Sequence, residues 1–263
     1  MNILDEIAAY TVERTNAEKK IIDLSTMRRD AESMAADDKA NYFSFENALK
    51  EPDMSFICEC KKASPSKGII AEEFPYVEIA KSYEAAGATA ISVLTEPNWF
   101  KGSNSFLKEI TENVSIPCLR KDFTVDEYMI FQAKTIGAKA VLLICSLLET
   151  KRLKEYREIA DSVGLSAIVE AHDEKEIESA MDAGARIIGV NNRNLKDFTV
   201  DINNSGRLRK LVPEEVLFVA ESGIKTNKDI EALKNMGVNA VLIGETLMRA
   251  DDKNKMLKEL KGI

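Results

Sequence analysis

The chain has 263 residues, 45% of them hydrophobic and 30% charged, a length that can bury either one α/β barrel or two smaller domains. Its net charge of −8 and pI near 5.0, without any basic block, argue against nucleic acid or an anionic membrane as partner. No apolar run approaches the roughly 18 residues of a membrane span, and the first residues lack the pattern of a secretory signal. We therefore expect a cytoplasmic protein.

After an amphipathic N-terminal segment, short β-rich runs alternate with segments whose apolar residues recur at helical spacing. The runs are FICEC from Phe56, TAISVL from Thr89, IPCLRK from Ile116, KAVLLI from Lys139, SAIVEA from Ser166, RIIGVN from Arg186, LFVAES from Leu217 and NAVLIG from Asn239. Runs that are apolar on both faces and joined through helices indicate a parallel sheet. Eight such units predict a closed (β/α)8 TIM barrel, with a doubly wound open sheet as the alternative.

Three of the helical segments end alike, in EAAGATA, KTIGAKA and KNMGVNA. The glycines Gly87, Gly137 and Gly237 suit the left-handed conformation that ends a helix just before the next strand. Because no Pro/Gly/Ser-rich linker interrupts this repetition, residues 1–263 are expected to form a single barrel domain.

The four cysteines lie in apolar, strand-like runs, without CxxC spacing and with one histidine in the whole chain. They are Cys58, Cys60, Cys118 and Cys145. Neither a metal site nor disulfides are expected from this pattern. It is typical of apolar thiols in a reduced core.

Polar side chains follow the predicted strands at their carboxyl ends, where barrels of this type carry their active sites. Since side chains alternate along a strand, Glu59 and Lys61 share one face and Cys60 points the other way. Lys121 and Glu170 end two further runs. Each alone is also typical of a solvated strand end, but carboxylates and lysines that converge on one mouth can tune each other for proton transfer.

Two later runs also end in polar residues. Asn191 and Arg193 share one parity, and Ser222 shares the parity of Ala220 and Phe218. We read His172, which follows Glu170 by two residues, as structural because no serine or cysteine nucleophile accompanies it.

The last two runs end in ESGI and IGET. Gly223 and Gly244 there would let a phosphate approach backbone N–H groups, a site that barrels often place after their last two strands, although either dipeptide alone is more typical of a turn.

The loop KASPSKG, which contains Ser64, predicts either a mobile flap over the mouth or an ordinary turn. The aromatic residues Trp99, Phe100 and Phe123 either line an apolar pocket or pack under a loop.

Taken in order, these stretches resemble indole-3-glycerol phosphate synthase of tryptophan biosynthesis. The matching motifs run from ECKKASPSKG through ISVLTEPNWFKGS, PCLRKDFTVDEY, IVEAHDE, IGVNNRNL and VAESGI to LIGETLM, over roughly residues 43–250. Residues 1–45 also resemble the helical extension that this family places ahead of its barrel. Trp99 stands where the family often has another aromatic residue, and Ala171 where a larger aliphatic residue is common.

The resemblance implies ring closure of 1-(2-carboxyphenylamino)-1-deoxyribulose 5-phosphate to indole-3-glycerol phosphate, with loss of carbon dioxide and water. It implies Lys121 as general acid, Glu170 as general base and Lys61 on the substrate carboxylate, with Glu59, Asn191 and Ser222 orienting these groups. The positions that match the family's substrate contacts are Phe100, Phe123, Leu142 and Leu195 in the aromatic pocket and Arg193, Gly223, Gly244 and Glu245 on the phosphate side, with Ser64 a further candidate.

Lysine suits the acid role because burial or a neighbouring cation can lower its pKa. The resemblance implies no cofactor and no metal. The expected partner is a small phosphorylated substrate, without nucleic acid or membrane. A monomer is expected, and contact with other enzymes of the tryptophan pathway is left open.

Two alternatives remain at this point. One is a sugar-phosphate isomerase barrel of the phosphoribosylanthranilate isomerase type, in which a cysteine of the first strand carries the proton, as Cys60 could. The other is a barrel that binds a phosphorylated metabolite without converting it, which would not need the pair of Lys121 and Glu170.

Overall fold

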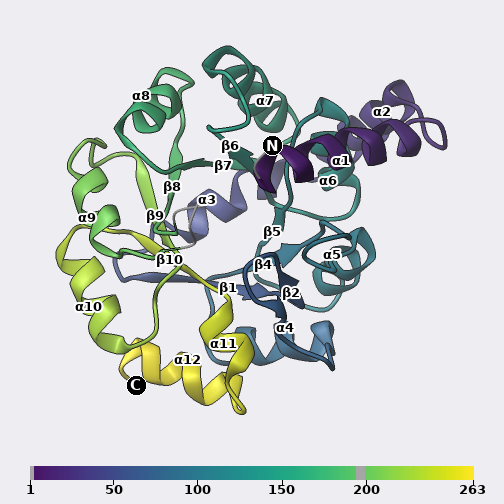
Figure 1. Ribbon diagram of the computed structural model, residues 1–263. Coiled ribbons are helices and arrows are strands. Elements are labelled where there is room, and N and C mark those ends of the chain that lie inside the picture. The colour runs from purple at the N-terminus through teal and green to yellow at the C-terminus, as the bar shows by residue number, and fades with distance from the viewer. Residues whose placement is uncertain (1–2, 194–198) are drawn as a thin grey trace.

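The computed structural model, which describes residues 3–193 and 199–263, contains a closed barrel of parallel strands surrounded by helices (Figure 1). The barrel strands are β1 (Ser55–Cys60), β4 (Ala90–Leu94), β5 (Cys118–Lys121), β6 (Ala140–Ile144), β7 (Ser166–Ala171), β8 (Ile187–Asn191), β9 (Leu217–Glu221) and β10 (Ala240–Ile243). Each strand pairs with its neighbour in chain order, and β1 pairs with both β4 and β10. The barrel prediction is confirmed, and the open sheet is excluded.

Helices cover the outside of the barrel between successive strands (Figure 1). They are α4 (Tyr76–Ala85), α5 (Asn104–Thr111), α6 (Glu127–Thr135), α7 (Thr150–Ser162), α8 (Glu174–Asp182), α9 (Asn203–Arg209), α10 (Asn227–Asn235), α11 (Glu245–Arg249) and α12 (Lys253–Lys261). The predicted helix ends are confirmed, because Gly87, Gly137 and Gly237 have φ of 82°, 86° and 79°. No helix in the described ranges is long and apolar enough to cross a membrane.

The strands bury both of their faces, in two separate apolar layers. The inner layer fills the barrel with residues such as Ile57, Leu119 and Ile168. The outer layer packs the sheet against the helices and includes Cys58 and Cys60. Cys60 therefore lies on the helix side of β1, as the alternation along the strand predicted.

The N-terminal segment is helical and reaches both ends of the barrel. It comprises α1 (Ile3–Glu18), α2 (Leu24–Asp37), the 3-10 turn η1 (Lys39–Asn41) and α3 (Ser44–Ala48). Phe45 and Leu49 pack among the first residues of the strands and close that end of the barrel. In Figure 1, α3 lies across the centre of the ring. Ile7 of α1 joins the inner layer from the opposite end, so helices cover both openings.

A buried ion pair fastens α1 to the segment that follows β5. Arg14 donates to both carboxylate oxygens of Asp122, at 3.0 Å each, and its side chain is 12% exposed while that of Asp122 is fully buried. Thr95 also donates to Asp122, at 2.7 Å. Just after the end of α1, Lys19 pairs with Asp126 at 2.6 Å, in a more exposed setting.

Candidate active site

A cavity of about 950 Å³ opens at the carboxyl ends of the barrel strands, partly under α1. It is lined by the predicted residues Glu59, Lys61, Ser64, Phe100, Lys121, Phe123, Leu142, Glu170, Asn191, Arg193, Ser222, Gly223, Gly244 and Glu245. Leu195 lies outside the described residues. The structure thus brings residues from the barrel strands and from the loops that follow them to one place, and their roles stay predictions.

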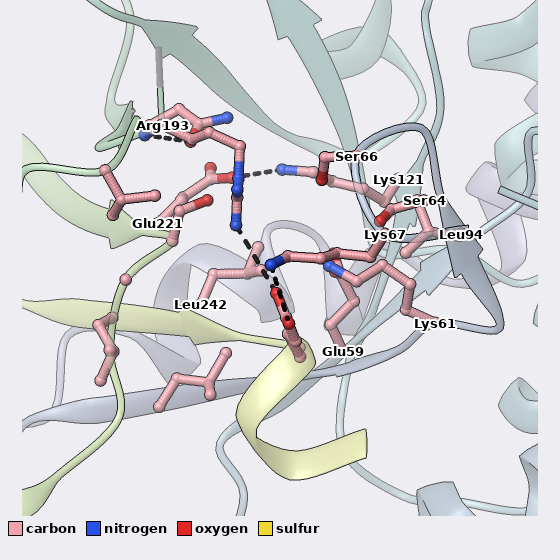
Figure 2. A pocket seen from close by; sticks show the side chains of 18 of the residues that line it. Glu59, Lys61, Ser64, Ser66, Lys67, Leu94, Lys121, Arg193, Glu221 and Leu242 are labelled. Atoms are coloured by element: carbon pink, nitrogen blue, oxygen red, sulfur yellow. Dashed lines mark hydrogen bonds and ion pairs between the residues drawn. The ribbon is translucent and has the colours of Figure 1, made fainter. Parts of the chain in front are cut away.

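Glu59 and Lys61 at the end of β1 form an ion pair inside this cavity, with 2.8 Å between Lys61 Nζ and Glu59 Oε1 (Figure 2). Ser92 of β4 donates to the other oxygen of Glu59 at 3.1 Å. A Cβ atom at Gly244 would lie 2.6 Å from Glu59 Oε1 and 2.9 Å from Lys61 Nζ. Gly244 therefore makes room for this pair, whether or not a phosphate also binds there.

A second cluster centres on Lys121, which reaches two carboxylates, Glu170 of β7 and Glu221 of β9; Figure 2 shows its contact with Glu221. Its Nζ atom donates to Glu170 Oε2 at 3.3 Å and makes a short contact with Glu221 Oε2. All three side chains are at most 13% exposed. Gly189 of β8 leaves space for Glu221, because a Cβ atom there would lie 2.5 Å from Glu221 Oε1. A buried cation with two carboxylates is a site suited to proton transfer.

The charges in this cluster shift one another. Burial would lower the pKa of Lys121, but the carboxylates of Glu221, Glu170 and Glu59 outweigh it and raise that pKa. The expectation of a lowered lysine pKa is thus wrong for this cavity. Burial opposes the charge on Glu170, yet Lys121 and His172 hold its pKa below the usual value. Burial raises the pKa of Glu221 to about 7, since Lys121 offsets it only in part. The two carboxyls are thereby separated in acidity, as acid and base partners in enzymes are.

Glu221 was not predicted from the sequence, and the parity predicted for the end of its strand is wrong. Ala220 and Phe218, whose parity Ser222 was expected to share, lie in the outer layer, whereas Val219 lies in the inner layer. The inward side chain is therefore Glu221, opposite Asn191 in the β8–β9 register. Ser222 still lines the cavity, in a left-handed conformation with φ of 68°. The signal that could have found Glu221 is an acid at the end of an apolar strand.

Two loops and helix α11 itself supply cations to the carboxylate of Glu245. Lys67 Nζ lies 3.9 Å from it, Arg193 lies 3.7 Å from it, and Arg249 donates to it at 3.2 Å; Figure 2 shows the first two contacts. Lys67 belongs to the loop predicted as a flap or a turn. The loop is a small antiparallel hairpin of β2 (Ala63–Ser64) and β3 (Gly68–Ile69) beside the mouth.

Aromatic rings line the α1 side of the cavity. The rings of Phe100 and Phe123 have centroids 6.0 Å apart, and the buried carboxylate of Glu96 holds the loop of Phe100 by accepting from three backbone N–H groups. Trp99 packs edge-on against Tyr10 of α1. Within residues 3–193 and 199–263, no group of three or more His, Cys, Asp and Glu side chains could hold a metal ion.

Comparisons with known proteins agree with one another. The family model described as "Indole-3-glycerol phosphate synthase" matches residues 4–260. A relative of that name from Ruminiclostridium cellulolyticum is 58% identical over 260 residues, covering 99% of both chains. Another from Endomicrobium trichonymphae is 54% identical and covers 98% of this chain and 99% of its own.

Solved structures support the fold alone. Thiamine phosphate pyrophosphorylase from Pyrococcus furiosus superposes with a TM-score of 0.62 at 18% identity, over 83% of this chain and 96% of that one. A chain of the tryptophan synthase complex from the same organism gives a TM-score of 0.60 at 14% identity, over 80% and 98% of the two chains.

Proposed function

The chain belongs to the indole-3-glycerol phosphate synthase family, whose members are carboxy-lyases of tryptophan biosynthesis, and on that premise we propose how its cavity closes the indole ring. The substrate is 1-(2-carboxyphenylamino)-1-deoxyribulose 5-phosphate, and the products are indole-3-glycerol phosphate, carbon dioxide and water. The observation that carries the proposal is the buried cluster in which Lys121 lies between Glu170 and Glu221.

Lys121 is the general acid. The aniline ring carbon that bears the carboxylate attacks the substrate's ketone carbon, and the ketone oxygen takes a proton from Lys121 as the new C–C bond forms. The raised pKa keeps the ammonium form fully populated at neutral pH. Because burial raises the pKa of Glu221 to about 7, its carboxyl can hold a proton near neutral pH, and that proton can replenish the lysine.

Loss of carbon dioxide then restores the aromatic ring, and the hydroxyl group leaves as water after taking a second proton. Glu170, the general base, removes one proton from the ring carbon next to nitrogen. Two protons are supplied and one is recovered, so each turnover takes up one proton from solvent. Asn191 supports the role of Glu170 as a base, because its side chain bonds to the ionised carboxylate.

Lys61 would contact the substrate carboxylate, with Glu59 fixing its position at 2.8 Å. Holding the ring carbon against the ketone is itself a large part of the rate enhancement. Phe100, Phe123 and Leu142 form the apolar wall for the anthranilate ring, with Ser64 beside it. Arg193, Gly223, Gly244 and Glu245 would surround the phosphate, and Ser222 would orient the groups between the two ends.

We further propose that residues 1–263 act as one domain, as a cytoplasmic monomer. The cavity mouth lies at the end of the barrel opposite α3, and contact with other enzymes of the tryptophan pathway would leave this mouth accessible if it involved the α3 end.

The decisive experiment adds the substrate to purified protein and follows indole fluorescence. Turnover is expected for the wild-type protein and for Cys60→Ser, whose side chain faces the helices, and it should be abolished in Lys121→Ala with the circular dichroism spectrum unchanged. An isomerase of the cysteine type would show the reverse dependence. Binding of the substrate without any product would reject the proposed reaction in favour of a metabolite-binding barrel.

A further inference from the structure

His172, the one histidine of the sequence, lies between the cavity and helix α8. Its Nδ1 atom is 3.2 Å from Glu176 Oε2, and that same oxygen accepts the backbone N–H of His172 at 2.8 Å. Asn204 of α9 donates to the His172 carbonyl at 3.2 Å. With its main chain and one ring nitrogen held, the ring directs Nε2 toward Glu170 Oε1, 3.7 Å away. This orientation is built by residues outside the cavity.

The two carboxylates that contact Lys121 differ in the other groups that lie beside them. Since Lys121 contacts both Glu170 and Glu221, the lysine alone does not determine which of them keeps its charge. Glu170 also faces His172, whereas Glu221 Oε1 is buried with no hydrogen-bond partner among the described residues. A buried carboxylate oxygen without a donor favours the protonated form, and one that faces a cation favours the ionised form.

We propose that His172 is a positioning residue that makes Glu170, and not Glu221, the ionised carboxylate on Lys121. The inference deepens the proposed function and rests on it, because Glu170 must be ionised to act as the base. It gives the histidine a part in the reaction without contact with substrate, in place of the purely structural role expected from the sequence.

The charged groups around this pair come from several elements. Glu170 faces Lys121 of β5 and Glu221 of β9 in addition to His172, and Glu59 of β1 acts on both Lys121 and Glu221. His172 itself faces Glu176 of α8 and, further away, Glu221. The Cys145 thiol beside Glu176 stays neutral because burial raises its pKa, and Asp173 lies near this thiol.

The carboxylates beside His172 favour a charged imidazole in the pH range in which Glu170 would begin to take up a proton. Burial opposes the charge on His172, but Glu176 and Glu170 outweigh it and raise the pKa of the imidazole above its usual value. The histidine therefore becomes cationic as the pH falls toward the range in which Glu170 would take up a proton. Its charge keeps Glu170 ionised to lower pH than Lys121 alone would.

One test is the pH dependence of kcat/KM. Replacing the imidazole in His172→Gln should move the acid limb to higher pH by about 1 unit, the lower end of the effect of an opposite charge at this distance. The limb should move in the same direction, by less, in Glu176→Gln, which frees the ring. A purely structural role would lower the rate equally at every pH, and an unmoved acid limb in His172→Gln would overturn the inference.

A second test needs no turnover. Because the sequence has one histidine, its NMR signals are assigned without ambiguity in untagged protein, and its titration reports this site alone. Coupling between two sites is reciprocal, so Glu170→Gln should lower the pKa of His172 by about the shift that His172→Gln causes in Glu170. Glu178→Gln, a carboxylate removed from the same helix α8, should leave it unchanged.

A titration of His172 that is unaffected by Glu170→Gln, or that responds more to Glu221→Gln, would reject the inference even if His172→Gln fails to fold. The two levels of the proposal fail separately. Wild-type protein without turnover rejects the proposed function, whereas a turning-over enzyme with no coupling between His172 and Glu170 rejects only the role of the histidine.

Discussion

Two ion pairs, at Arg14 of α1 and at Lys19 just after its end, hold this part of the chain to the segment after β5 and allow burial to be compared with distance as the source of stability. Arg14–Asp122 joins atoms 3.0 Å apart, with side chains 12% and 0% exposed. Lys19–Asp126 is shorter, at 2.6 Å, with side chains 26% and 30% exposed. If short distance decided the contribution, Lys19 would matter more. If burial decides it, Arg14 should dominate, because removing one partner strands the other charge away from water.

We expect Arg14→Gln to lower the free energy of unfolding by about 3 kcal/mol, the lower end for a broken buried pair, since Thr95, Arg120 and the N–H of Phe123 still contact Asp122. Lys19→Gln should cost about 0.5 kcal/mol, the usual value for an accessible pair. For a chain of this length about 2 °C of melting temperature corresponds to each kcal/mol, so the expected shifts are about 6 °C and about 1 °C.

Urea and thermal unfolding of wild type, Arg14→Gln and Lys19→Gln would measure these differences. A matched double variant, Arg14→Gln with Asp122→Asn, should recover part of the loss, because it no longer leaves a buried carboxylate without its arginine. Equal effects of the two single substitutions, or a larger effect of Lys19→Gln, would refute the assignment of this stability to burial.

Three further predictions follow from the barrel. Gly189→Ala places a Cβ atom 2.5 Å from Glu221 Oε1 and should lower kcat about 100-fold while the protein still unfolds cooperatively; an unchanged kcat would mean that Glu221 can move freely. Phe45→Ala should cost about 4 kcal/mol in urea unfolding without changing KM, because α3 closes the end opposite the cavity. The native state holds a proton on Glu221 up to about pH 7, more tightly than the unfolded chain, so this group's contribution to stability is lost as pH rises from about 4.5 to about 7. The unfolding free energy of Glu221→Gln should therefore fall less between pH 5 and 7.5 than that of wild type, and an identical fall would contradict the shift.

The barrel and most of the cavity residues could be predicted because their signals are local. Each strand is a short apolar run, each glycine stop precedes a strand, and Lys121 and Glu170 end runs whose register is clear. Strand β9 gave no such register, because residues 217–220 are all apolar and are followed by polar residues on both parities, Glu221 and Ser222. A shift of one residue reverses every side chain along a strand, and that is how Ser222 was assigned the parity that belongs to the outer layer.

Other features depend on residues far apart in the chain. The pair of Arg14 and Asp122 spans 108 positions, and no local pattern joins them. The pKa of Lys121 could not be inferred either, because it depends on Glu221, which the sequence analysis had left out.

The helices that close the two ends of the barrel come first in the chain, yet their partners come late. Glu46 of α3 pairs with Arg186, 140 positions downstream, and Arg14 of α1 pairs with Asp122, 108 positions downstream. At about 5 to 20 residues per second, a ribosome needs roughly 5 to 30 s to make the intervening chain. During that time neither ion pair can form, and α1 and α3 lack the later strands on which part of their apolar faces packs. The nascent chain is therefore expected to depend on chaperones for its first half, and fragments that stop before β7 should aggregate.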